Sequence, residues 1–166
     1  MTEQKIQIRS YDMNDAPQLY EIDSLVWNED NSPIEITLGS LTDYEQKLSS
    51  DKYLGVLVAE KEGTICGYIN FRAPSQLESH QHVMEIAIAI HPQFQKLGIG
   101  RKLLESAYEW GRENGKQKIS LRAMSSNSAT IQFYHSCGYK EQGRFINEFY
   151  LNNQYIDDVF MYKFIK

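Results

Sequence analysis

The feature that most constrains the fold is an apolar stretch that runs through a glycine-rich turn into an amphipathic helix. Residues 83–90 are apolar except for Glu85, and they end at His91-Pro92. Residues 95–100, Gln-Lys-Leu-Gly-Ile-Gly, form the turn, and apolar positions then recur at helical spacing as far as Gly115. We therefore predict a buried strand followed by a helix whose N-terminus is built from glycines.

Alternation and helical periodicity place the other elements on both sides of this unit. The first helix is expected to begin at Asp15-Ala16-Pro17, with Asp15 as its cap and the proline in its first turn. Its apolar stripe is formed by Leu19, Ile22, Leu25 and Val26. Further strands are expected at 6–10, 53–59, 64–73, 119–123, 139–150 and 155–165, and further helices at 41–50 and 127–137. The order β-α-α-β-β-β-α-β-α-β-β predicts one α/β (α+β) domain over residues 1–166, with a mixed, twisted sheet and helices on both faces.

The charge and hydropathy of the chain argue against several classes of partner. The chain has 17 Lys and Arg against 22 Asp and Glu, so its net charge of −5 does not favour binding to nucleic acid. No apolar run approaches the roughly 20 residues of a membrane helix. The first thirty residues lack the apolar core of a signal peptide. We expect a cytoplasmic protein with neither a nucleic-acid nor a membrane partner.

Neither the cysteines nor the histidines have the spacing of a metal site. Cys66 and Cys137 lie far apart in the sequence, and we expect two reduced thiols. His80, His82 and His91 are spread over a loop and a strand end. We therefore expect no metal and no covalent acyl-cysteine.

The glycine-rich turn has the features of an anion site. Helix N-termini carry unpaired backbone N–H groups and a positive dipole, and Gly98 and Gly100 would let a phosphate approach them. Lys96 and Arg101 add positive charge nearby. The ATP-binding loop pattern is absent, and Leu103 stands where a dinucleotide-binding fingerprint needs its third glycine. From the glycines alone, a phosphate cradle and a plain tight turn remain equally open.

Two linked motifs narrow the choice, because together they resemble the GNAT superfamily of N-acetyltransferases. The signature of that family, Gln/Arg-x-x-Gly-x-Gly/Ala after a strand that ends near a proline, is matched at 95–100. Downstream the family has Asn, Ala, an aromatic pair and Gly-Phe/Tyr. This chain has Asn127, Ala129, Phe133-Tyr134 and Gly138-Tyr139 at the corresponding positions. The order of elements matches over nearly the full length.

The resemblance implies acetyl-CoA as the cosubstrate and assigns binding roles along the chain. The turn would hold the pyrophosphate through Gln95, Lys96, Leu97, Gly98, Ile99, Gly100 and Arg101. Main-chain groups of Ile88 and Ile90 would pair with the pantetheine arm. Asn127 would lie beside that arm, and Tyr134 would contact the sulfur.

Two side chains are candidates for the chemistry of acetyl transfer. An alkylammonium with a pKa of about 10.4 must lose a proton before it attacks. Glu85, alone in an apolar strand, is our candidate base, although it could equally be a strand-end carboxylate paired with a cation, and a bulge would change the face it points to. Tyr134 is our candidate acid for the leaving thiolate. It shares a helix face with Asn127, seven residues earlier, and the alternative is a core aromatic.

The acceptor is less constrained than the cofactor. Residues 152–161 resemble the ending Asn-Gly-x-Tyr-x-Asp-x-x-x-Met of bacterial acetyltransferases for free amino acids and of ribosomal-protein Nα-acetyltransferase-like relatives, with Asn153 in place of the glycine. We expect the segments Val26–Leu38 and Pro74–His82 to form the acceptor site. Trp27, Glu29, Asp30 and Glu35 are the candidate lining residues.

We therefore predict an acetyl-CoA-dependent N-acetyltransferase that passes the acetyl group directly to a primary amine of a small molecule, such as an amino acid. Protein N-terminal acetylation, polyamine or aminoglycoside acetylation, and a non-catalytic acyl-CoA-binding module remain as alternatives. The sequence leaves a homodimer open.

Overall fold

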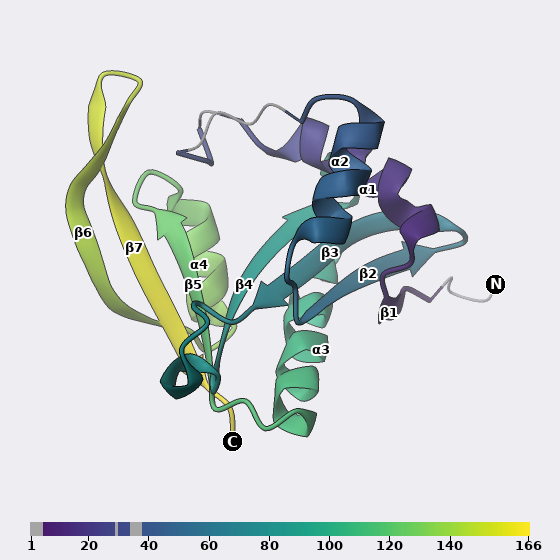
Figure 1. Ribbon diagram of the computed structural model, residues 1–166. Coiled ribbons are helices and arrows are strands. Elements are labelled where there is room, and N and C mark those ends of the chain that lie inside the picture. Colours follow the sequence, from purple (N-terminus) through teal and green to yellow (C-terminus); the bar gives the residue numbers. More distant parts are fainter. Residues whose placement is uncertain (1–4, 29, 34–37) are drawn as a thin grey trace.

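The computed structural model describes residues 5–28, 30–33 and 38–166, and in this part of the chain seven strands form one sheet (Figure 1). The strands are β1 (Gln7–Ser10), β2 (Gly55–Lys61), β3 (Thr64–Arg72), β4 (Val83–Ile90), β5 (Lys118–Met124), β6 (Lys140–Leu151) and β7 (Gln154–Phe164). Their order across the sheet is β1-β2-β3-β4-β5-β7-β6, and only β4 and β5 run parallel. The predicted mixed sheet and order of elements are confirmed.

Helices cover both faces of the sheet, as predicted. The α-helices of the described chain are α1 (Ala16–Val26), α2 (Leu41–Ser50), α3 (Ile99–Glu113) and α4 (Ser128–Ser136). A larger core joins one face to α3 and α4, and a smaller core joins the other face to α1 and α2. Side chains alternate between the two, so that Met84 and Ile86 of β4 enter the larger core while Ala89 enters the smaller one.

Tight turns with positive φ connect the two predicted hairpins. Glu62 and Gly63 have φ of 52° and 80°, and Asn152 and Asn153 have φ of 51° and 59°. Asparagine tolerates this left-handed region better than other residues with side chains, which explains how Asn153 serves where a glycine was expected.

The start of α1 differs from the expected cap. Asp15 occupies the N-cap position, but its side chain makes no capping hydrogen bond to α1. Its carboxylate instead accepts hydrogen bonds from Arg9 and from the backbone N–H of Asp12. These bonds tie the start of the helix to β1.

The buried face of α1 also differs from the predicted stripe. Leu19 and Ile22 are buried as expected, but Leu25 is 50% exposed. The buried face instead includes Asp23, whose side chain is almost fully buried. At 100° per residue, Asp23 lies only about 40° from Leu19 around the helix, whereas Leu25 lies on another side. The smaller core therefore contains a carboxylate. None of the helices in the described chain is long and apolar enough to span a bilayer.

Candidate active site

The main opening in the sheet lies between β4 and β5. These strands pair only through Val83–Lys118, Met84–Ile119 and Glu85–Ser120. Beyond Glu85, β4 continues to Ile90 with β3 as its partner, and β5 continues with β7 as its partner. Figure 1 shows the two strands side by side at their starts and apart at their ends. A parallel pair that separates in this way leaves one edge of β4 without a strand.

Backbone groups of alternate residues in β4 point toward this opening. The N–H of His91 donates to the carbonyl oxygen of Cys66, opposite it on β3, at 2.8 Å. Because hydrogen-bonded pairs alternate along an antiparallel ladder, Ala89 and Ala87 also bond to β3. The N–H and C=O groups of Ile88 and Ile90 therefore point away from β3, toward the opening. The carbonyl of His82, in phase with these residues, accepts from Gln117 on that side at 2.8 Å.

The glycine-rich turn forms the N-terminus of α3, as predicted. Gly98 is the N-cap residue in the left-handed region, with φ of 79° and ψ of 9°, and Lys96 also has a positive φ of 63°. The first hydrogen bond into the helix is from Lys102 N–H to the Gly98 carbonyl, which leaves the N–H groups of the first turn directed outward. A Cβ atom at Gly98 would meet nothing within 4 Å, so its backbone is open to a ligand.

Gly100 has a packing reason that the sequence did not reveal. A Cβ atom there would lie 3.0 Å from Cζ of Phe133 in α4, so the missing side chain lets the start of α3 pack closely on α4. Arg101 donates a hydrogen bond of 3.2 Å to Ser136 Oγ at the far end of α4. The two motifs singled out in the sequence, the turn and α4, are therefore in direct contact.

The two predicted residues of the second motif lie at the start of α4 and in its last turn. Asn127 is the N-cap residue, but its side chain makes no capping hydrogen bond, so the amide remains available for another partner. Tyr134 is 5% exposed, and its ring packs against Phe133 and Tyr139. Burial raises the pKa of Tyr134 above its ordinary value, and Cys137 adds to the shift. The phenol therefore keeps its proton at neutral pH.

Glu85 occupies the last position of β4 that pairs with β5, where the opening begins. The β3–β4 register is continuous from Arg72–Glu85 to Gly67–Ile90, so no bulge turns the side chain. Glu85 thus lies on the same face as Ala89, toward α1 and α2, and it is partly exposed. No cation among the described residues forms an ion pair with Glu85. The pKa of Arg122 is raised chiefly by its hydrogen bond to Asp158, and the negative charge of Glu85 adds to this effect.

Glu85 and Tyr134 lie on opposite faces of the sheet. Tyr134 belongs to the larger core on the α3 and α4 side, and Glu85 faces the α1 and α2 side.

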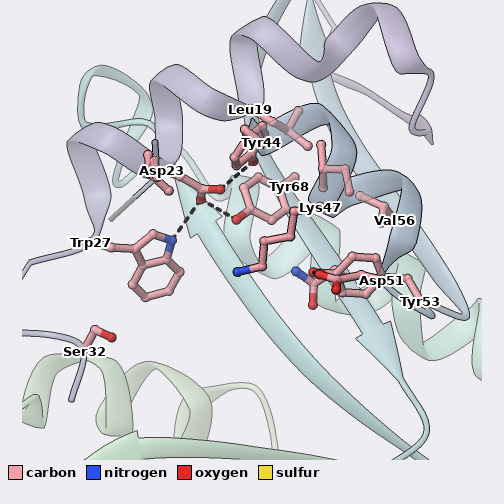
Figure 2. A pocket seen from close by; sticks show the side chains of 13 residues that line it. Leu19, Asp23, Trp27, Ser32, Tyr44, Lys47, Asp51, Tyr53, Val56 and Tyr68 are labelled. Carbon is pink, nitrogen blue, oxygen red and sulfur yellow. Dashed lines mark hydrogen bonds between the residues drawn. The ribbon is translucent and has the colours of Figure 1, made fainter. Parts of the chain in front are cut away.

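A cavity of about 280 Å³ lies on the Glu85 face, between α1, α2 and β3 (Figure 2). Its polar centre is Asp23, whose carboxylate accepts hydrogen bonds from Trp27 Nε1 at 2.9 Å, Tyr44 Oη at 2.6 Å and Tyr68 Oη at 2.5 Å. Burial raises the pKa values of Tyr44 and Tyr68, and the charge of Asp23 raises them further, so both hydroxyls remain donors. Leu19, Leu48 and Val56 contribute apolar walls.

The sequence predicted this cavity only in part. Trp27 and Leu38 line it as expected from the segment Val26–Leu38, but the residues that line it include none from Pro74–His82. Glu29 and Glu35 lie outside the described residues. Asp30 is not a lining residue, because its carboxylate accepts a hydrogen bond from Asn152 Nδ2 at 3.1 Å. The signal that could have found the rest was an aspartate at a core position of the first helix.

The cysteines and histidines do not gather into a metal centre among the described residues. Cys66 and Cys137 are both free thiols, the first buried and the second partly buried. His91 caps the short helical turn Pro92–Phe94, where its Nδ1 accepts a hydrogen bond from the backbone N–H of Gln93 at 3.1 Å.

Comparison with known proteins identifies the family. The model of the acetyltransferase (GNAT) family matches residues 16–139, more than half of the chain. The L-methionine sulfoximine/L-methionine sulfone acetyltransferase of Salmonella typhimurium is 33% identical over 84 residues, which are 51% of this chain and 49% of that enzyme. The match to this curated relative thus spans about half of its length.

Solved structures support the same assignment. A protein from Streptococcus mutans UA159 is 26% identical, with a TM-score of 0.88 over 96% of this chain and 99% of that chain. A putative acetyltransferase from Salmonella typhimurium, solved with its cofactor acetyl-CoA, shares the fold at 23% identity, with a TM-score of 0.80 over 97% and 94% of the two chains. With the match of the family model over residues 16–139, these likenesses show that the chain belongs to the acetyltransferase (GNAT) family.

Proposed function

We propose that the protein transfers the acetyl group of acetyl-CoA directly to a primary amine of a small molecule. The observation that carries this proposal is the opening between β4 and β5. It leaves a strand edge unpaired at Ile88 and Ile90, with the candidate base Glu85 at the point where β4 and β5 separate. The helix N-terminus at Gly98 and the candidate acid Tyr134, on the α3 and α4 side of the sheet, support the proposal further.

The residues around the opening fit acetyl-CoA by their chemistry. The outward N–H groups at the start of α3 suit a pyrophosphate, since they are unpaired donors at the positive end of a helix dipole. Lys96 in the turn and Arg101 in the first turn of α3 add positive charge. The free edge of β4 suits the amides of a pantetheine arm, which can pair with it like an added strand. When bound, acetyl-CoA supplies an activated acyl group with a thiolate leaving group.

The flanking side chains supply the proton transfers. Glu85 accepts a proton from the incoming ammonium, directly or through water, on the face where the cavity lies, and so frees the neutral amine to attack. Tyr134 holds its proton, because burial raises its pKa, and donates it to the departing sulfur from the other face. The amine forms the new bond to the acetyl carbon as the bond from carbon to sulfur breaks. Neither cysteine needs to carry the acetyl group, so transfer is direct.

A small-molecule acceptor is favoured over a protein by the size of the cavity. At about 280 Å³ it is just below the roughly 300–1,000 Å³ typical of small-ligand sites, which suits a small acceptor. The Salmonella typhimurium relative named above acts on L-methionine derivatives, which is consistent with an acceptor the size of an amino acid.

The decisive experiment measures thiol release from acetyl-CoA with a panel of free amino acids, diamines, aminoglycosides and peptides with free N-termini. We expect release to depend on a small amine and the product to carry an acetyl group on nitrogen by mass spectrometry. If acetyl-CoA binds but no amine of the panel stimulates release, the protein is an acyl-CoA-binding module. If only peptides react, the acceptor is a protein N-terminus.

A further inference from the structure

We propose that the cavity beneath α1 and α2 binds the acceptor, and that Asp23 selects an acceptor with a second cationic group besides the reacting amine. This inference rests on the proposed function and deepens it. It commits to one class of acceptor, a small primary amine with a distal ammonium.

The first argument is the uncompensated charge of Asp23. Its side chain is almost fully buried, and all three of its hydrogen-bond donors, from Trp27, Tyr44 and Tyr68, are neutral. No described cation lies within ion-pairing distance of it, and Lys47, which lines the same cavity, makes no ion pair with it. Hydrogen bonds from neutral groups hold a carboxylate in place but leave its negative charge, which a buried cation would neutralise.

The carboxylate also has capacity left for a ligand. Its two oxygens offer about four acceptor positions. Among the described residues, Oδ1 accepts from Trp27 and Tyr68, while Oδ2 accepts only from Tyr44. Oδ2 can therefore accept one more hydrogen bond. Figure 2 shows the three donors gathered around Asp23 at one end of the cavity.

The walls of the cavity favour the same ligand chemistry. Trp27, Tyr44, Tyr53 and Tyr68 surround it with aromatic rings, whose faces attract cations. A second carboxylate, Asp51, lines the cavity and accepts a hydrogen bond from Tyr53 Oη at 3.0 Å. The charged lining residues are thus two aspartates against one lysine, Lys47, which gives a net charge of −1.

The cavity is placed to deliver an amine to the opening. Tyr68 and Asn70 of β3 line it, and they lie opposite Ala89 and Ala87 of β4. Neighbouring strands are about 4.8 Å apart, so the lining of the cavity is one strand away from the free edge of β4. Ala89 is buried in the smaller core, but Ala87 is partly exposed on that face, so an acceptor would reach Glu85 past Ala87.

The test uses four acceptors that separate a distal ammonium from an α-carboxylate. Lysine has both groups, norleucine has only the carboxylate, 1,5-diaminopentane has only the distal ammonium, and pentylamine has neither. We expect the distal ammonium to raise kcat/KM by about 10- to 100-fold in both pairs, the usual range for a hydrogen bond to a charged group. Equal values of kcat/KM within each pair, or a preference governed by the carboxylate alone, would overturn the inference.

Two variants assign the effect to the charge of Asp23. Asp23→Asn keeps the shape of the side chain but removes the charge, so the ratio between members of each pair should fall to about one. Tyr44→Phe removes one donor and keeps the charge, so the ratio should persist. An unchanged ratio in Asp23→Asn would contradict the assignment. If Asp23→Asn does not fold, the ratios measured in the parent protein still decide.

The four acceptors also separate this inference from the proposed function on which it rests. Acetylation of neutral amino acids with no benefit from a distal ammonium would leave the acetyltransferase intact and refute the role of Asp23. Thiol release with none of these amines, nor with any of the wider panel, would refute the acetyltransferase itself.

Discussion

At the scale of single residues, burial separates the two candidates for proton transfer. Tyr134 is enclosed by aromatic rings in the larger core, which raises its pKa and preserves it as a donor. Glu85 is partly exposed at the mouth of the opening, where an incoming amine and water can reach it. This division suits an acid for a buried sulfur and a base for a solvent-borne acceptor.

We expect Tyr134→Phe to lower kcat by about 10²-fold, the general scale for a proton-transfer group, with little change in the affinity for CoA. Tyr139→Phe is a matched control, because Tyr139 is also a buried tyrosine whose pKa is raised by burial, and its ring packs on Tyr134. Turnover measured at saturating acetyl-CoA should fall only in the first variant. Equal turnover in both, with chemistry rate-limiting, would make Tyr134 a packing residue.

We expect Glu85→Gln to lower turnover by an amount that shrinks as pH rises, because more of the acceptor is then already neutral. The loss should be smaller for an α-amine, with a pKa of roughly 7.7–8.0, than for an alkylamine near 10.4. Profiles of rate against pH for parent and variant, with one acceptor of each kind, check this. A constant ratio across pH with both acceptors would show that Glu85 only orients the amine.

At the scale of elements, the turn before α3 and the free edge of β4 are complementary halves of one binding site. The turn offers N–H groups at a helix end, and the strand offers N–H and C=O groups along its length. Each half can be tested by itself.

For the turn, we expect Gly98→Ala to weaken binding of CoA strongly. The side chain would enter open space beside the outward N–H groups, and at φ of 79° it would also cost about 1–2 kcal/mol of stability. Gly63→Ala is the matched control, since Gly63 has φ of 80° and equally open surroundings in the β2–β3 hairpin. Both variants should lose similar stability in thermal unfolding, while only Gly98→Ala should lose affinity in calorimetry. Equal affinity in both would refute the phosphate cradle.

For the strand, hydrogen exchange should show an alternation that depends on acetyl-CoA. The amides of Ala87 and Ala89 bond to β3, so they should exchange slowly in all conditions. The amides of Ile88 and Ile90 face the opening, so they should exchange faster and become protected when acetyl-CoA is added. Protection that spreads evenly over all four amides, or is absent, would contradict pairing of the cofactor with this edge.

At the scale of the whole molecule, the sheet consists of two parts that are joined at one end. The strands β1 to β4 and the strands β5 to β7 meet through only three residue pairs of β4 and β5. A ligand between these strands would contact both parts and fill the place of the missing ladder.

We expect acetyl-CoA to stabilise the folded protein by about 2.7 kcal/mol at a concentration 100 times its Kd. Adenosine 3′,5′-bisphosphate lacks the pantetheine arm and one phosphate of the pyrophosphate. It should stabilise the protein much less, because it leaves the free edge of β4 unpaired and gives the turn only one phosphate. Thermal unfolding with each ligand measures the difference. Equal stabilisation by the two ligands at equal concentrations would show that contacts with the free edge of β4 contribute nothing to binding.

Much of the fold could be predicted from the sequence because it is encoded locally. Alternation placed the strands, and Gly98, Gly63 and Asn153 marked turns that require a positive φ. The face of α1 was harder to predict, since hydrophobicity alone assigns Leu25 to its apolar stripe. The helical angle assigns that place to Asp23, whose burial is tolerable only because Trp27, Tyr44 and Tyr68 supply hydrogen bonds.

The order of the elements and the glycine turn at the start of α3 could be predicted from the sequence, because each depends on backbone conformation or periodicity over a few residues. Three features could be seen only in the folded chain. β4 and β5 separate after Glu85, Gly100 makes room for Phe133, and a buried carboxylate lies at the centre of the cavity. These features arise where segments far apart in the chain meet. Asp23, for example, accepts its hydrogen bonds from the end of α1, from α2 and from β3. The physical reason is that the packing and charge of such a site belong to the contacts between segments, which no local pattern records.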